Sequence, residues 1–115
     1  MAMEKDCVFC RIAAGEIPAD RVYEDADNIV FKDIKPAAPV HLLAIPRRHV
    51  AKLSDCGEGE GELLAGLLLA AGRAAKAQRL GDFRLIVNNG IGAGQTVFHL
   101  HAHILAGARM SEKLL

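Results

Sequence analysis

The chain has 115 residues, of which 51% are hydrophobic and 24% charged, and its 14 basic and 14 acidic residues give a net charge of zero. This size and composition predict a single soluble globular domain over residues 1–115 that can bury a core without disulfides. Because no basic run is present, neither nucleic acid nor a membrane surface is an expected partner. With zero net charge, copies of the chain repel one another little, which is compatible with a homodimer that buries apolar surface.

The sequence also favours a cytoplasmic protein with reduced thiols. Residues 1–6 are polar and lack the apolar segment of a secretory signal. The most apolar stretch, residues 63–72, is too short to span a bilayer. The three cysteines are an odd number and do not form a disulfide framework.

The first half of the chain predicts a short helix and three strands. Residues 8–14 resemble a helical turn that is stopped by Gly15. Residues 21–24 and 28–33 are β-rich and are separated by a hairpin-like acidic turn. Residues 41–45 are continuously apolar after the histidine and predict a buried strand that ends at a proline.

The second half predicts one long helix and two strands. Residues 60–80 carry Leu and Ala at helical spacing, and Gly81 stands at the expected C-cap. Residues 83–87 and 97–105 predict strands on either side of a glycine-rich loop. The strands cluster around a single long helix without regular βαβ alternation, which favours an α+β fold with a mostly antiparallel sheet.

Three of the five histidines stand at every second position near the C-terminus, at His99, His101 and His103. Successive side chains of a strand point to opposite faces, so the three imidazoles are expected to share one face. The residues on the other face would bury themselves in the core, and these are Phe98, Leu100, Ala102 and Ile104. A merely solvated strand face would more commonly carry Thr, Lys or Glu, so we favour a chemical role.

Geometry restricts what the histidine row can do. Residues i and i+4 of a strand lie roughly 13 Å apart, so His99 and His103 cannot ligate one metal ion in an extended strand. Two neighbouring histidines could share a metal with outside ligands. Catalysis suits the row better, because neutral imidazole can attack phosphorus and other imidazoles can orient it or transfer protons.

The loop before the row offers hydrogen-bond donors for an anion. Glycines at positions 90, 92 and 94 let backbone N–H groups approach closely, and Asn88, Gln95 and Thr96 add side-chain donors. The loop leads into a strand and not into a helix, so it is not a dinucleotide-binding fingerprint. Alone it could be an ordinary hairpin loop, but beside the histidines we interpret it as a phosphate loop.

Residues 98–104 resemble the motif of the histidine triad (HIT) family, and residues 7–18, 31–46 and 87–107 are similar to its Hint branch, the purine nucleoside phosphoramidases. The resemblance implies a HIT-like α+β fold with about five antiparallel strands, one long helix and a short N-terminal helix. It also implies a homodimer formed through the long helix and an edge strand. The chain departs from the family at Ala106-Gly107, where Gly-Gly is common, and in its tail, residues 110–115, which lacks Trp.

The resemblance assigns roles by position. His101 matches the nucleophile, His103 the histidine that contacts phosphate oxygens, His41 an orienting histidine, and His99 a structural one. Asp33 matches the acid that binds the ribose hydroxyls. The positions that match the purine pocket are Phe9, Ile12, Ile17, Phe31 and Ile34. The positions that match the phosphate-binding loop are Asn88, Gly94, Gln95 and Thr96.

Cys7 and Cys10 form a C-x-x-C pair. A redox role would need a thioredoxin-like βαβ context, which is missing, and a closed zinc site would need two further ligands. HIT relatives that keep this pair are similar to this chain, and they use four matching positions for zinc. The resemblance therefore implies a zinc site at Cys7, Cys10, His49 and His99. The alternative is two half-buried free thiols, and Cys56 is expected to be incidental.

The expected function is hydrolysis of purine nucleoside 5′-phosphoramidates through a covalent nucleotidyl intermediate on His101, with an AMP-like ligand and with zinc only as a structural ion. One alternative is a dinucleoside polyphosphate hydrolase or nucleotide transferase, for which Arg47, Arg48 and Arg109 are the candidate cations. Another is a non-catalytic zinc- or nucleotide-binding module that acts through protein partners.

Overall fold

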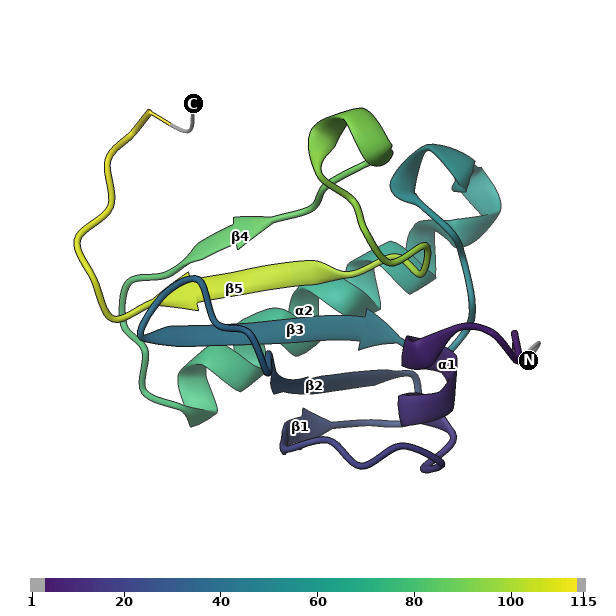
Figure 1. Cartoon of the computed structure of the whole chain (residues 1–115), viewed down its shortest axis with the longest axis horizontal. Coiled ribbons are helices and arrows are strands. Elements are labelled where there is room, and N and C mark those ends of the chain that lie inside the picture. Colours follow the sequence, from purple (N-terminus) through teal and green to yellow (C-terminus); the bar gives the residue numbers. More distant parts are fainter. Residues whose placement is uncertain (1–3, 114–115) are drawn as a thin grey trace.

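The computed structural model of the chain describes residues 4–113, so the last two residues of the tail lie outside the described part (Figure 1). In chain order the elements begin with α1 (Val8–Ala13), β1 (Arg21–Glu24), β2 (Asn28–Lys32) and β3 (Val40–Pro46). They continue with α2 (Gly61–Ala77), β4 (Arg84–Ile86) and β5 (Ala102–Ala106). Short 3-10 turns at Leu53–Asp55, Glu58–Glu60 and Ile91–Ala93 punctuate the connections.

The five strands form one antiparallel sheet in the order β1-β2-β3-β5-β4. The last strand in sequence, β5, therefore lies inside the sheet, between β3 and β4. In the β3–β5 register, Leu43 pairs with His103 and His41 with Leu105. This topology confirms the predicted α+β fold, and the register places two of the histidines on neighbouring strands.

The two helices lie on opposite faces of the sheet (Figure 1). The helix α2 buries Leu67 and a row of alanines on its inner side. These pack against residues of the central strands and of the segment before β5, namely Val30, Leu42, Ala44, Leu100, Ala102 and Ile104. On the other face, Phe9 and Ile12 of α1 pack on Ile29, Phe31, Leu43 and Ile45. Within residues 4–113 no helix combines the length and apolar character needed to cross a membrane.

The predicted strand over residues 97–105 is wrong in its first half. β5 starts only at Ala102, because the preceding segment has no neighbouring strand and the backbone N–H of Leu100 donates instead to Val50 O at 2.7 Å. Phe98 was expected in the core and is 39% exposed. The alternation nevertheless holds from residue 99, since Leu100, Ala102 and Ile104 are buried against α2.

The end of the long helix also differs from the prediction. The helix α2 stops at Ala77, and Arg79, with φ 55°, takes the left-handed conformation expected of a glycine. The N–H groups of Arg79 and Leu80 still donate to the carbonyls of Lys76 and Ala75. Gly81 has φ 67° but stands in the following loop, so it is not the C-cap.

Candidate nucleotide site and metal-binding cluster

A cavity of about 420 Å³ opens between α1, the end of β2 and the start of β5, and its surface is mostly apolar. It brings together most of the residues predicted to bind a nucleotide, which are Phe9, Ile12, Ile17, Phe31, Asp33, Ile34, Thr96, His101 and His103. Sequence reasoning missed further lining residues, among them Leu43, Val97, Lys32 and Lys35. The cavity thus joins an apolar slot, a carboxylate and two imidazoles.

The wall of the cavity is held by aromatic packing and by arginines. The ring of Phe9 meets that of Phe31 edge to face, with centroids 5.7 Å apart. The C-terminal carbonyls of α1 accept from two guanidinium groups, Arg21 to Ile12 O at 2.8 Å and Arg47 to Ala13 O at 3.4 Å. These bonds satisfy carbonyls that a helix end leaves unpaired, and they fix the short helix to the sheet.

His101 lies at the inner end of the cavity in a defined tautomer. Its Nδ1 is 2.7 Å from the backbone oxygen of His99. A carbonyl only accepts, so Nδ1 carries the proton and Nε2 keeps its lone pair. Burial lowers the pKa of His101, because desolvation disfavours the charged ring. His101 therefore presents a neutral imidazole with a free Nε2, which is the form that can act as a nucleophile.

His41 and His103 form a second ordered pair. The backbone N–H of Ala37 donates to Nδ1 of His41 at 2.9 Å, so neutral His41 carries its proton on Nε2. That Nε2 is 2.9 Å from Nδ1 of His103 and 3.3 Å from Oδ2 of Asp33. His103 Nδ1 therefore accepts, and the proton of neutral His103 is on Nε2. Burial lowers the pKa of His103, with help from His101 and His41, while Asp33 acts in the opposite direction.

The same three side chains, Asp33, His41 and His103, are close enough to resemble a metal site, with ligand atoms within 4.8 Å of one another. The hydrogen bonds argue against this interpretation. Because Nδ1 of His41 accepts from Ala37, a metal on Nε2 would require His41 to lose both ring protons. The cluster is better described as a hydrogen-bonded chain that ends at His103.

The predicted phosphate loop is braced from inside by Gln95. Its buried side chain accepts from Gly90 N–H at 2.8 Å and donates to Ala51 O at 2.8 Å and to Val97 O at 3.0 Å. The amide of Gln95 is thus already engaged, and neither it nor Asn88 nor Gly94 lines the cavity. Gly94 has φ 93°, which explains why glycine stands there. Contact of Asn88, Gly94 or Gln95 with a phosphate stays a prediction.

A separate cluster unites Cys7, Cys10, His49 and His99. Nδ1 of His99 is 3.3 Å from Cys7 Sγ, 3.4 Å from Cys10 Sγ and 3.2 Å from His49 Nδ1. Cys10 Sγ is 3.3 Å from His49 Nδ1. A tetrahedral zinc ion with bonds of about 2.0–2.3 Å holds its ligand atoms about 3.3–3.8 Å apart, so these four distances nearly match the required spacing, and all four atoms lie within 4.8 Å of one another.

The surroundings of His99 prepare its Nδ1 for a metal. Its Nε2 donates to Pro46 O at 2.7 Å, which leaves the lone pair on Nδ1 facing the two sulfurs. Burial lowers the pKa of His99 to about 4, so the ring stays neutral near pH 7. Burial also raises the pKa of Cys10, so a thiolate there is favoured only beside a cation. These residues can hold a metal ion, and two Cys with two His suit zinc.

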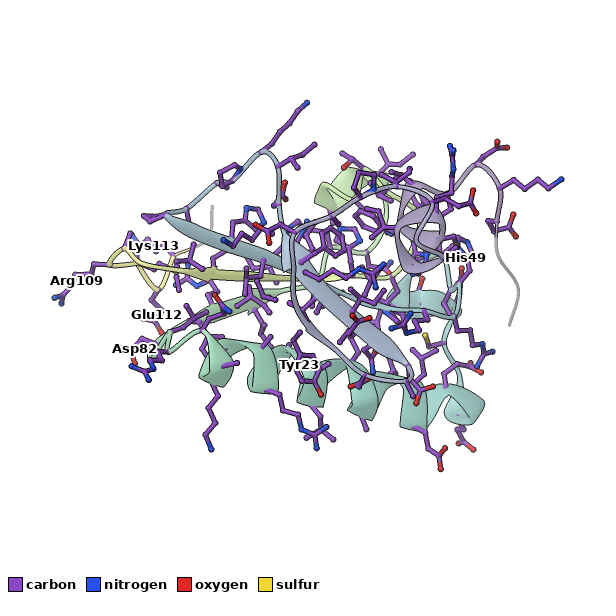
Figure 2. All side chains as sticks on the ribbon, turned by 90° about the horizontal axis from the view of Figure 1, so that it is seen from below. Tyr23, His49, Asp82, Arg109, Glu112 and Lys113 are labelled. Carbon is purple, nitrogen blue, oxygen red and sulfur yellow. The ribbon has the colours of Figure 1, made fainter. Side chains whose placement is uncertain are left out.

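Arg47, Arg48 and Arg109, the candidate cations from the sequence, do not line the cavity. Arg47 bonds to Glu24 at 2.9 Å, and Arg48 is 3.6 Å from Glu60. Arg109 projects from the end of the molecule opposite His49 (Figure 2). The cationic side chains that line the cavity are those of Lys32 and Lys35.

Comparison with known proteins places this arrangement in a family. The family model described as "Scavenger mRNA decapping enzyme C-term binding" matches residues 6–114. Protein HitA of Neisseria gonorrhoeae is 50% identical over 101 residues, which are 87% of this chain and 94% of that protein. The chain belongs to the histidine triad (HIT) family. An uncharacterized HIT-like protein of Synechocystis is 48% identical over 110 residues, covering 95% of this chain and 96% of that one.

Solved HIT structures agree with the fold. A HIT family hydrolase from Clostridium thermocellum superposes with a TM-score of 0.94 at 44% identity, over 97% of this chain and 99% of that one. A HIT family hydrolase from Legionella pneumophila superposes with a TM-score of 0.89 at 45% identity, over 93% of this chain and 97% of that one. These likenesses support a HIT-type nucleotide-binding hydrolase for the present chain.

Proposed function

We propose that this HIT protein hydrolyses purine nucleoside 5′-phosphoramidates, as the resemblance to the Hint branch implies. The observation that carries the proposal is the fixed pair of tautomers at one end of the cavity. His101 offers a bare Nε2, and His103 offers an Nε2–H. One ring can attack phosphorus while the other donates to an oxygen of the same phosphoryl group.

The chemistry proceeds in two displacements. The phosphoramidate nitrogen takes up a proton from solvent, Nε2 of His101 attacks phosphorus, and the P–N bond breaks with its electron pair leaving on the amine. His101 is then a nucleotidyl imidazolium whose Nδ1–H still donates to His99 O. Water next attacks phosphorus, and the bond to His101 breaks with its pair returning to Nε2. One proton of the water returns to solvent, which balances the proton taken up by the amine, and the other stays on a phosphate oxygen.

The rest of the cavity fits the nucleoside. The purine would lie between Phe9, Ile12 and Ile17 on one side and Phe31 and Ile34 on the other. The carboxylate of Asp33 would accept from the ribose hydroxyls, a contact that also serves in dinucleotide-binding folds. Thr96, which lines the same cavity, would add a donor near the phosphate.

The Cys7–Cys10–His49–His99 cluster would hold zinc as a structural ion. Bound zinc neutralises two thiolates and ties the start of α1 to the segment that carries His101. In the proposed mechanism the metal takes no part in the displacement at phosphorus.

The surface fits a homodimer built through α2 and β4. Leu68 and Leu69 are each 55% exposed on the helix, on the side away from the sheet. β4 ends the sheet, and Phe83, Leu85 and Val87 on and beside it are also exposed. Joining two such edges and helix faces would cover both apolar groups.

The alternative of a dinucleoside polyphosphate hydrolase or nucleotide transferase is less well supported. Such substrates leave as phosphates and call for extra positive charge at the leaving group. None of Arg47, Arg48 and Arg109 lines the cavity, and the two lysines that do, Lys32 and Lys35, flank Asp33 in sequence, at the side proposed for the ribose. Comparing kcat/KM for an adenosine phosphoramidate and for a diadenosine polyphosphate distinguishes the two, and a higher value for the second would reverse the assignment.

The proposal is tested by following amine release from an adenosine 5′-phosphoramidate of an aromatic amine. Wild type and Cys56→Ser are expected to turn over equally, because Cys56 lies outside the cavity. His101→Ala is expected to lose turnover by at least about 10⁴-fold, as for other lost nucleophiles. Mass spectrometry after a quench without acid should find the nucleotidyl group on His101. Equal turnover by His101→Ala would refute the mechanism, and nucleotide binding without any adduct or turnover would favour a non-catalytic module.

A further inference from the structure

We propose that His99 couples the Cys7–Cys10–His49–His99 cluster to the nucleotide cavity, so that a metal ion in the cluster and a nucleotide in the cavity strengthen each other's binding. In this role His99 is a positioning residue that acts on the reacting ring through its backbone. The inference rests on the nucleotide site of the proposed function, but it does not require that the bound nucleotide be hydrolysed.

His99 belongs to both sites through different atoms. Its ring nitrogen Nδ1 faces Cys7 and Cys10 at 3.3 and 3.4 Å. Its backbone oxygen accepts from Nδ1 of His101 at 2.7 Å. The side chain is fully buried, and its Nε2 is fastened to Pro46 O at 2.7 Å. A ring held at both nitrogens cannot turn freely, so a metal on Nδ1 would fix the backbone that sets the tautomer of His101.

Phe9 provides a second connection. It stands between the two cysteines in sequence, and its ring meets that of His99 with centroids 6.0 Å apart and that of His101 at 5.2 Å. Both contacts are edge to face, with interplanar angles of 77° and 84°. The same ring lines the nucleotide cavity. A displacement of the cysteines would therefore move a wall of the cavity and a neighbour of His101 together.

The helix that carries these residues depends on outside support. α1 has only 6 residues, far below the length at which an isolated helix is stable. The arginine bonds hold its C-terminal end, whereas at its N-terminal end the side-chain cap seen within residues 4–113 is the Cys7 sulfur, which accepts from Cys10 N–H at 3.3 Å. A metal bound by Cys7 and Cys10 would anchor that end to His49 and His99, on other parts of the chain.

The coupling must be reciprocal. If metal binding orders α1 and the carbonyl of His99 in the form that the nucleotide needs, the nucleotide must tighten the metal by the same factor. Typical couplings between two sites change affinity about 5- to 150-fold. Three atoms carry the link here: Nδ1 and the backbone oxygen of His99, and Nδ1 of His101.

The experiment uses the full chain, AMP as the nucleotide probe, and Zn²⁺ or Co²⁺ as the metal. We expect AMP to bind the zinc-loaded protein at least about 5-fold more tightly than the chelator-stripped protein, and to slow transfer of zinc to a competing chelator. In the Co²⁺-loaded protein, which stays metal-bound throughout, AMP should shift the visible absorption bands of the thiolate-bound ion. This second measurement does not depend on whether the stripped protein stays folded.

Two variants sharpen the test. Phe9→Leu keeps an apolar wall but removes the ring that contacts both histidines, and it should reduce the Co²⁺ band shift and the AMP–zinc coupling while zinc still binds. Cys56→Ser should leave both unchanged, because Cys56 lies outside the cluster. Coupling in a protein that does not hydrolyse phosphoramidates would support this inference and refute the proposed function. Hydrolysis by a protein that binds AMP and Co²⁺ with no band shift and equal affinities would overturn the inference, and so would a wild-type chain that binds no zinc.

Discussion

Nε2 of His41 lies 2.9 Å from Nδ1 of His103, and the proton between them belongs to His41, because Ala37 occupies the other nitrogen of that ring. The backbone N–H of Ala37, in the loop between β2 and β3, thus makes His41 the donor in this hydrogen bond. As a consequence, neutral His103 carries its own proton on Nε2, the nitrogen that does not face His41. This arrangement also means that the reactivity of His103 depends on a residue that does not line the cavity.

Replacing His41 should therefore lower catalysis without abolishing nucleotide binding. We expect His41→Ala to reduce kcat by about 10- to 100-fold, the usual cost of losing an orienting partner, with a smaller change in KM. His41→Gln should recover part of the loss, because its amide can donate to Nδ1 of His103. Steady-state kinetics of the three proteins measures the effect, and an unchanged kcat in His41→Ala would contradict the proposed chain.

Asp33→Asn tests the contact with ribose. The carboxylate lines the cavity, and its Oδ1 also accepts from Lys35 N–H at 2.8 Å. We expect the variant to lose about 10-fold or more in kcat/KM, because a hydrogen bond to a charged group contributes roughly 1.5–3 kcal/mol.

The matched control for Asp33 is a substrate without the 2′-hydroxyl. Wild type should discriminate against the deoxyribose substrate, whereas Asp33→Asn should discriminate less. If kcat/KM falls by the same factor for both proteins on the deoxyribose substrate, Asp33 does not contact the 2′-hydroxyl. Its role is then limited to its contacts with Lys35 N–H and with His41.

The acid limb of the pH profile follows from the buried histidines. Burial lowers the pKa of His103 and of His101 from 6.5, so their neutral forms persist to more acidic pH than in a free imidazole. We expect kcat/KM to hold as pH falls past 6.5 and to decline only below it, with the titration of the substrate measured separately. A decline centred above 6.5 would contradict the environment described for these rings.

The free energy of unfolding should also decrease as the pH falls. The unfolded chain binds protons on histidine below about pH 6.5, whereas the buried rings resist protonation, so the unfolding free energy falls as pH drops below that point. Urea unfolding at pH 7.5 and at pH 5 with saturating zinc measures the difference. Equal stabilities at the two pH values would not fit.

Gly107 packs closely against Pro39 and Val40, next to His41 in the chain. It has φ 90°, and a Cβ placed there would lie 2.9 Å from Cβ of Pro39, the residue just before β3, which carries His41. We expect Gly107→Ala to destabilise the fold by about 1–3 kcal/mol through strain and crowding, and to lower kcat through a shifted His41.

Gly61→Ala is the control for Gly107. Gly61 begins α2, has ordinary helical φ and ψ angles, and nothing lies within 4 Å of an added Cβ. Alanine there should be neutral or stabilise by up to about 1 kcal/mol. Thermal or denaturant unfolding should show a loss of stability for Gly107→Ala and no loss for Gly61→Ala. A loss in both would contradict the explanation by crowding against Pro39.

The homodimer can be tested by charging its proposed interface. Leu69→Glu places a carboxylate on the exposed face of α2 and should produce a monomer in sedimentation equilibrium. Leu53→Glu makes the same change on an exposed leucine of a 3-10 turn and should leave the oligomeric state of the wild type unchanged. A monomeric wild type would show that the apolar face of α2 has another purpose.

The sequence predicted the fold well, and it predicted which side chains come together around the cavity and in the cysteine–histidine cluster, because these depend on side-chain patterns. The alternation of His99, His101 and His103 with buried neighbours indicated the face that carries the imidazoles, and the C-x-x-C pair indicated the cluster. The tautomers could not be predicted, because they are set by the backbone N–H of Ala37, which any residue but proline would supply, and by the carbonyls of Pro46 and His99, which every residue type has. The bracing role of Gln95 was missed for the same reason, since its partners are mostly main-chain atoms.

The sheet keeps the alanine-lined face of α2 on one side and the nucleotide cavity on the other. The larger of the two buried clusters therefore lies on the face of the sheet away from the cavity. Ile17 and Ile34, at the rim of the cavity, can change in size or polarity with little effect on the packing under α2. Substitutions at these two positions should therefore change which bases the cavity accepts while leaving the free energy of unfolding nearly unchanged.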